Sequence, residues 1–137
     1  MKTPVLFRDR SRLTQVLLGG VIPAAIGGLA GVLVGVSETG YLIVGAIAAL
    51  GGFLAGFEHR DGWGGADRGV VGGGIYGIAL LVAHEIEGSA AEVSLGEHPV
   101  LLPVVTAIIG MLLGALGGRI ARAQRERAES EPAAEPR

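Results

Sequence analysis

Half of the 137 residues are hydrophobic and only 18% are charged, whereas a soluble globular domain carries roughly a quarter charged residues, so this composition excludes a soluble fold. The net charge is −2, and no folded basic module with aromatic side chains accompanies the arginines, which excludes nucleic-acid binding. Cysteine is absent, so disulfides, thiolate metal sites and thiol nucleophiles are excluded as well.

Four long runs without Asp, Glu, Lys, Arg or His organise the sequence. They cover residues 13–37, 39–57, 69–83 and 100–118. About 20 residues of helix cross the roughly 30 Å hydrocarbon core of a bilayer, so the first, second and fourth runs are long enough to span it. The third run reaches that length only if its helix continues to Glu87. The sequence therefore predicts an all-α polytopic membrane protein whose four-helix transmembrane domain, residues 13–118, has spans at about 13–37, 39–57, 69–87 and 100–118.

The chain begins with a basic segment over residues 1–12, and the first span follows it directly. The uncharged run of this span is too long for the roughly 7–15-residue apolar part of a secretory signal. Pro23 lies well inside the span and has no backbone N–H. It therefore releases the carbonyl of Gly19, which predicts a kink near Gly19 and Gly20.

A polar cluster, residues 58–61, follows the second span, and the glycines of residues 62–65 predict a flexible turn before the third. His59, Asp61 and Asp67 include residue types that bind metals. They lack a recognised ligand spacing, so we expect no metal site here.

Two prolines, Pro99 and Pro103, predict the beginning of the fourth span, because the first turn of a helix has free backbone donors in any case. The tail over residues 119–137 is expected to continue as a helix, with arginine and glutamate pairs at four-residue spacing. Residues 130–137 are rich in proline and alanine and are expected to be disordered.

Basic residues are divided unevenly among the connecting segments. Four precede the first span, two lie between the second and third, and five follow the fourth, whereas residues 38–40 and 84–99 contain none. Because basic residues accumulate on the cytoplasmic side, both termini and the middle connection are predicted to be cytoplasmic. We therefore expect a multi-pass protein of the plasma membrane in contact with the lipid bilayer.

Glycine accounts for 25 residues, and within the predicted spans it recurs at every fourth position. Residues four apart lie on one face of a helix, so each GxxxGxxxG series leaves a smooth surface that a neighbouring backbone can approach closely. The predicted helix-packing positions are Gly27, Gly31, Gly35, Gly52, Gly56, Gly69, Gly73, Gly77, Gly110, Gly114 and Gly118. They predict helices packed through glycine and small-residue faces, within one chain or between the copies of a homo-oligomer.

Polar chemistry is sparse in the predicted spans. None of the four runs contains an ionisable residue, which disfavours ion-coupled transport. His84, in the predicted extension of the third span, is the clearest candidate for an ionisable residue near the membrane. Glu85 is next to it, and Glu38 lies in the neighbouring hairpin. These residues form a speculative polar site, either a protonation-sensitive contact or a cation site, and the alternative is a helix end that meets water. We predict no catalytic residues and no cofactor. The glycines of residues 72–77 do not form a phosphate loop, since they lack its Lys-Ser or Lys-Thr pair.

The segments GGFLAGFEHR and GADRGVVGGGIYG, separated by glycine-rich sequence, lie in the middle of the chain. In this pattern, from Leu13 to Arg119, the chain resembles small glycine-rich four-span membrane proteins of unknown function. The resemblance implies a membrane fold and no activity. We expect a non-enzymatic accessory or structural subunit that acts through helix–helix packing with another membrane protein. The alternative is an oligomeric pore, or a passive channel or transporter for a small solute or ion.

Overall fold

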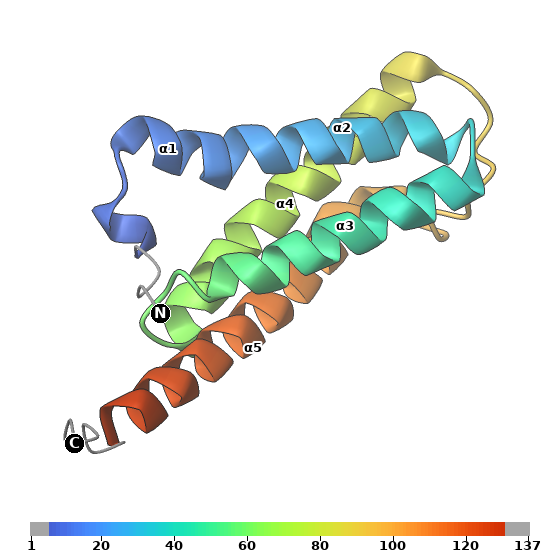
Figure 1. Ribbon diagram of the computed structural model, residues 1–137. Coiled ribbons are helices and arrows are strands. Elements are labelled where there is room, and N and C mark those ends of the chain that lie inside the picture. Colours follow the sequence, from blue (N-terminus) through green and yellow to red (C-terminus); the bar gives the residue numbers. More distant parts are fainter. Residues whose placement is uncertain (1–5, 131–137) are drawn as a thin grey trace.

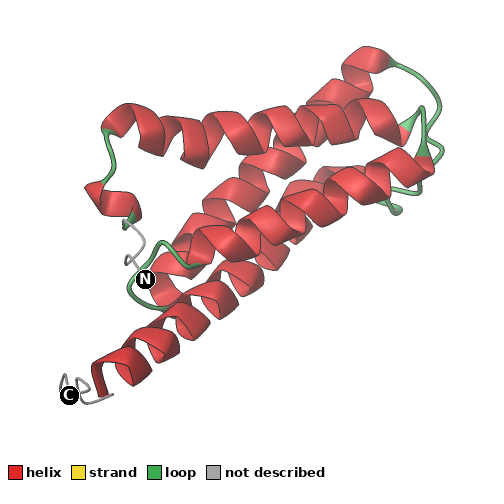
Figure 2. Ribbon diagram, viewed as in Figure 1, coloured by secondary structure: helices red, strands yellow, loops and turns green. Residues whose placement is uncertain are grey.

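The chain folds into long helices joined by short turns and one longer loop (Figures 1 and 2). The computed structural model describes residues 6–130, and within that range every regular element is helical. In chain order, the elements are the 3-10 turn η1 (Phe7–Asp9), α1 (Arg12–Val16), the π-helical turn η2 (Leu17–Val21), α2 (Ile22–Val34), α3 (Glu38–Gly56), α4 (Gly62–Glu87), the 3-10 turn η3 (Pro99–Leu101) and α5 (Leu102–Ser130).

Four helical segments of the described chain are long and apolar enough to cross a membrane. They are Arg12–Val34, Glu38–Gly56, Gly62–Glu87 and Pro99–Ser130. Large apolar side chains on their outer faces, such as Leu42, Ile47 and Leu112, are more than half exposed, as expected of surfaces that contact lipid. The predicted all-α fold with four spanning helices is therefore confirmed, and the protein is a multi-pass integral membrane protein in contact with the bilayer.

The first spanning segment consists of α1, η2 and α2 in succession. Ser11 starts it by accepting a hydrogen bond from the backbone N–H of Thr14 at 3.2 Å. Where Pro23 predicts a kink, the structure has the π-helical turn η2, which contains both Gly19 and Gly20. The turn is wider because proline cannot donate to the carbonyl one helical turn before it.

Helix α4 begins at Gly62, well before the uncharged run that predicted it. Asp61 starts the helix by accepting a hydrogen bond at 2.8 Å from the N–H three residues later, so the flexible turn predicted after Asp61 is wrong. Arg68 consequently lies inside a spanning helix, which corrects the expectation that the spans carry no ionisable residue. The helix continues to Glu87 and is followed by Gly88, whose φ of 74° is the left-handed conformation that favours glycine.

Helix α5 begins after η3, whose first residue is a proline, and extends beyond the apolar segment to Ser130. Arg122 and Glu126 form one of the predicted pairs, with Nε and Oε1 2.7 Å apart. Arg125 instead reaches the connection between α3 and α4. The rest of the tail that was predicted to be disordered lies outside the described residues.

Helix α4 packs along α2 and along α5 (Figure 1). A Cβ atom at Gly27 or Gly31 of α2 would overlap backbone carbonyl oxygens of α4. A Cβ atom at Gly69 of α4 would overlap the carbonyl oxygen of Gly110 in α5, and the reverse is also true. These crossings therefore bring backbones together at a distance that only glycine permits.

The fully buried side chains gather at the end of the bundle where α2 joins α3. Ala30, Val34 and Leu80 have no exposed surface and join α2 to α4, with Tyr41 of α3 packed against them. The loop after α4 closes over this region, since the N–H of Glu92 donates to the carbonyl of Val34 at 2.9 Å. The opposite end, which we call the basic end, comprises residues 6–12, 57–62 and 119–130 (Figure 1).

Candidate functional site

A cavity of about 470 Å³ lies between α2 and α3, with α4 and α5 forming its remaining walls. The two helices meet at the turn that joins them and separate toward the basic end (Figure 1). Leucine, isoleucine, glycine and alanine residues from the four long helices make the wall predominantly apolar. The polar exceptions are Glu58, Arg68, Tyr76 and Thr106.

Helix α3 lines the cavity with small residues, among them Gly45, Ala48 and Gly52. A Cβ atom added at Gly45 or Gly52 would meet no other atom within 4 Å. Gly52, predicted to pack against a helix, therefore faces the cavity instead. One turn later, Gly56 does contact the backbone of α5.

The other predicted packing glycines each lie against another part of the chain. Gly27 and Gly31 face α4, Gly35 faces Ser89 in the loop after α4, Gly69, Gly73 and Gly77 face α5, Gly110 and Gly114 face α4, and Gly118 faces Asp61 before α4. In the described chain these smooth faces are therefore occupied by intramolecular contacts.

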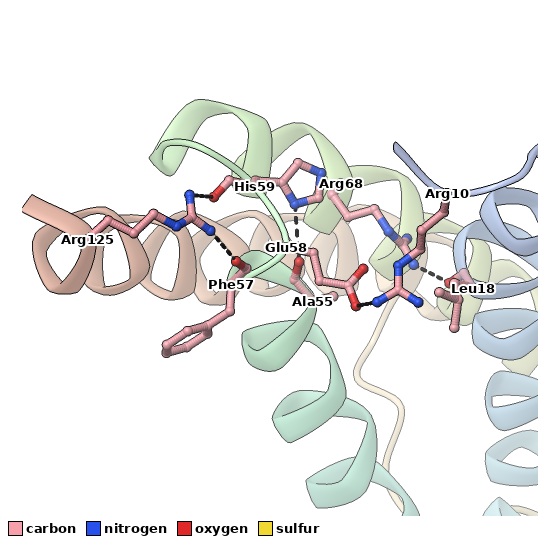
Figure 3. A network of polar contacts seen from close by, with 8 residues as sticks. All are labelled: Arg10, Leu18, Ala55, Phe57, Glu58, His59, Arg68 and Arg125. Atoms are coloured by element: carbon pink, nitrogen blue, oxygen red, sulfur yellow. Dashed lines mark hydrogen bonds and ion pairs between the residues drawn. The ribbon is translucent and has the colours of Figure 1, made fainter. Parts of the chain in front are cut away.

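Arg68 extends from α4 to the π-helical turn η2 at the basic end of the cavity (Figure 3). One terminal nitrogen of its guanidinium donates to the carbonyl of Leu18 and the other donates to the carbonyl of Gly19 at 3.4 Å. The Gly19 carbonyl is the one that Pro23 leaves without its usual helical donor. A side chain from another helix thus satisfies the backbone group released by the proline.

The segment that precedes α1 lies against this site. We call residues 7–10 the N-terminal strap. Arg10 forms an ion pair with Glu58 at 2.7 Å (Figure 3), and the N–H of Phe7 donates to the carbonyl of Glu58 at 3.0 Å. The Phe7 ring stacks on His59 with centroids 5.7 Å apart, and the guanidinium of Arg68 lies 5.2 Å from the same ring centroid. The strap therefore joins the α3–α4 connection to the basic end of the cavity.

His59 connects the strap to α5. Its Nδ1–H donates to the carbonyl of Ala55 at 3.1 Å, while Arg125 of α5 donates to the carbonyls of His59 and Phe57, both at 3.0 Å (Figure 3). Burial lowers the pKa of His59 below its ordinary value. The nearby charge of Arg68 acts in the same direction, and the hydrogen bond to Ala55 opposes it. Burial and Arg68 thus favour the neutral form of His59 in the folded protein.

The speculative polar site lies away from the cavity, at the end where α2 joins α3. His84 is partly buried in α4, and Glu85 and Glu38 are exposed. No ion pair joins these three residues in the described chain, and no three His, Asp or Glu side chains of residues 6–130 are grouped to hold a metal ion. The hypothetical cluster of His59, Asp61 and Asp67 is likewise not such a group.

Sequence reasoning missed Arg68, Glu58 and the N-terminal strap as parts of one site. Arg68 lies one residue outside the charge-free run that predicts the third span. The sequence signal that places Arg68 in the third span is Asp61, because aspartate often caps the start of a helix. A helix beginning after Asp61 places Arg68 inside the third span.

Comparison with protein families, with curated proteins and with solved structures gives no match to this chain. The conclusion that this chain is a four-span membrane protein consequently depends on the length and composition of its own helices.

Proposed function

We propose that this chain is a non-enzymatic membrane protein that binds the acyl chain of a lipid in the cavity between α2 and α3. The observation that carries the proposal is the cavity itself. Its volume of about 470 Å³ lies within the roughly 300–1,000 Å³ typical of ligand sites. Its wall is apolar, with a few polar groups toward one end, which is the arrangement expected of a site for an amphipathic molecule.

The depth of the cavity fits one leaflet of a bilayer. Arg68 and Tyr76, both in the cavity wall, are eight residues apart on α4, which corresponds to about 12 Å along the helix axis. Half of a hydrocarbon core is about 15 Å. The distribution of basic residues supports a cytoplasmic basic end, so in the plasma membrane the cavity would receive a lipid of the inner leaflet.

Two of the four polar residues of the wall already pair with the backbone. Thr106 donates to the carbonyl of Leu102 at 2.9 Å, and both terminal nitrogens of Arg68 donate to backbone carbonyls. The GxxxG series support the proposed function indirectly, since they hold the helices of one chain together around the cavity.

The test is photolabelling in nanodiscs with phosphatidylcholine that carries a diazirine on its acyl chain. We expect the wild-type protein to be labelled at cavity residues such as Tyr76. Gly52→Leu fills the cavity from a position where nothing else lies within 4 Å, so it should reduce this labelling severalfold. Gly28→Leu is the matched control, because Gly28 is equally unobstructed but does not line the cavity. Equal labelling of Tyr76 in the wild type and both variants would reject the proposal.

A second candidate is an accessory subunit that packs against another membrane protein. The open small-residue face of α3, with Gly45 and Gly52, favours it, because a partner helix could approach closely there. A protein that copurifies with the wild type and is lost from Gly52→Leu, without lipid labelling of Tyr76, would select this candidate. The oligomeric pore has less support, because the glycine faces proposed to line it contact other parts of the same chain.

A further inference from the structure

Arg68 forms no ion pair with a carboxylate among the described residues. The ion pairs in residues 6–130 are Arg10 with Glu58 and Arg122 with Glu126. Arg68 donates only to neutral carbonyls, although it is half-buried and belongs to a spanning helix. A cation in such a place is costly, and it normally pairs with another group in a functional site.

Two buried donors at the same end of the cavity also lack an acceptor. The Nε atoms of Arg10 and Arg68 are inaccessible to solvent and have no hydrogen-bond partner within residues 6–130. Each buried donor of this kind calls for an acceptor. Arg10, in the bend before α1, and Arg68, in α4, both extend to the same side of Glu58 in the close-up view (Figure 3).

The net charge of this group of side chains is positive. Two guanidinium groups, of Arg10 and Arg68, lie near a single carboxylate, that of Glu58, which forms its ion pair with Arg10. An arginine recognises phosphate especially well, because its planar guanidinium offers several donors to the phosphate oxygens.

We propose that the cavity selects an anionic phospholipid, whose phosphate group is the counter-ion of Arg68 and whose acyl chain lies along the apolar wall toward Tyr76. A zwitterionic lipid such as phosphatidylcholine has the same phosphate but also a choline cation, which the excess positive charge of Arg10 and Arg68 would repel. This inference rests on the proposed function, that the cavity holds an acyl chain, and adds the chemistry of the head group. Arg68 serves both purposes: it satisfies the carbonyls of η2 and places a positive charge where the head groups of the proposed inner leaflet begin. Glu58 competes with the phosphate for the guanidinium groups and so limits the affinity.

The experiment titrates the full-length protein in mild detergent with phosphatidylglycerol or phosphatidylcholine of identical acyl chains and counts bound lipids by native mass spectrometry. We expect the wild type to prefer phosphatidylglycerol by about tenfold or more, as a hydrogen-bonded charge pair provides. Arg68→Gln should lose this preference, so that it binds the two lipids with equal affinity. Arg60→Gln makes the same change of charge at an exposed residue of the basic end, so it should keep the preference.

Glu58→Gln provides a second test, since it removes the competing carboxylate without changing the size of the side chain. It should increase the preference for phosphatidylglycerol severalfold. If Arg68→Gln does not fold, Glu58→Gln by itself tests the head-group inference. Unchanged lipid preference in a folded Arg68→Gln protein would overturn the inference. A decrease, or no change, in Glu58→Gln would also overturn it.

Failure of the head-group inference is separable from failure of the proposed function. Equal affinity for the two lipids, with labelling of Tyr76 that Gly52→Leu still blocks, would remove the head-group selectivity and leave the acyl-chain site intact. Absence of lipid labelling in the cavity would remove both, as expected if the cavity receives a helix of another protein.

Discussion

Pro23 leaves a backbone carbonyl without its usual hydrogen-bond donor, and Arg68, which is distant in the sequence, supplies one. The proline removes a backbone donor, and the unpaired carbonyl of Gly19 can be predicted from the sequence alone. Its partner could not be predicted, because Arg68 is 49 residues away and approaches only when α4 packs beside η2. Unpaired backbone groups are costly inside a membrane, so this contact fixes the position of Arg68 at the cavity.

His59 gives a pH-dependent stability at the same end of the molecule. Its pKa is lowered in the folded protein, chiefly by burial, so the unfolded chain takes up a proton more readily below about pH 6.5. The free energy of unfolding therefore decreases as the pH falls from about 6.5 toward the lowered pKa. We expect the Tm in detergent to fall by a few degrees between about pH 7.5 and about pH 5.5, and to fall less in His59→Gln.

His98→Gln is the control for this measurement, because His98 is exposed in the loop at the other end. Its Tm should follow the same dependence on pH as the wild type. If His59→Gln also kept the full dependence, another group would be responsible for it.

At the scale of elements, helix α4 is the centre of the bundle because α2 and α5, with which it packs most extensively, both approach it through glycine. The spacing of the glycines predicted which faces are smooth, and that follows from the geometry of a helix. The spacing did not predict which partner each face meets. Gly69 lies against α5, whereas Gly52 belongs to a similar looser series and faces the cavity.

Alanine substitution separates these two environments. Gly69→Ala should destabilise the protein by about 1–3 kcal/mol or more, because its Cβ would overlap the backbone of α5, which cannot move aside as a side chain can. Gly52→Ala should be neutral or stabilise by up to about 1 kcal/mol, since alanine favours the helix and nothing obstructs it. Helical circular dichroism during denaturation measures both changes, and equal stability of the two variants would contradict the packing described for α4 and α5.

At the scale of the whole molecule, the bundle has two dissimilar ends. One end carries the strap, the α3–α4 connection and the extension of α5, with their arginines, and the other carries the α2–α3 turn and the acidic loop after α4 (Figure 1). This polarity favours one orientation in the membrane, with the basic end in the cytoplasm. The absence of cysteine makes that orientation simple to measure.

Single cysteines at exposed positions report the side of the membrane. Ser94→Cys in the loop after α4 should react with a membrane-impermeant maleimide in intact cells. Ala128→Cys near the end of α5 should react only after the cells are permeabilised. The reverse pattern would invert the proposed topology and place the cavity in the outer leaflet.

By itself, the sequence determined that the chain is helical and spans the membrane four times, and it predicted irregular backbone near Pro23. These properties depend on local composition, run length and the missing donor of one residue, none of which needs knowledge of distant neighbours. The tertiary structure alone decided that α2 and α3 separate to form a cavity and that Arg68 reaches it. It also decided which glycines meet a backbone and that Gly52 meets none. Those outcomes depend on helix crossings between residues far apart in the chain, and a regular glycine spacing is compatible with more than one such arrangement.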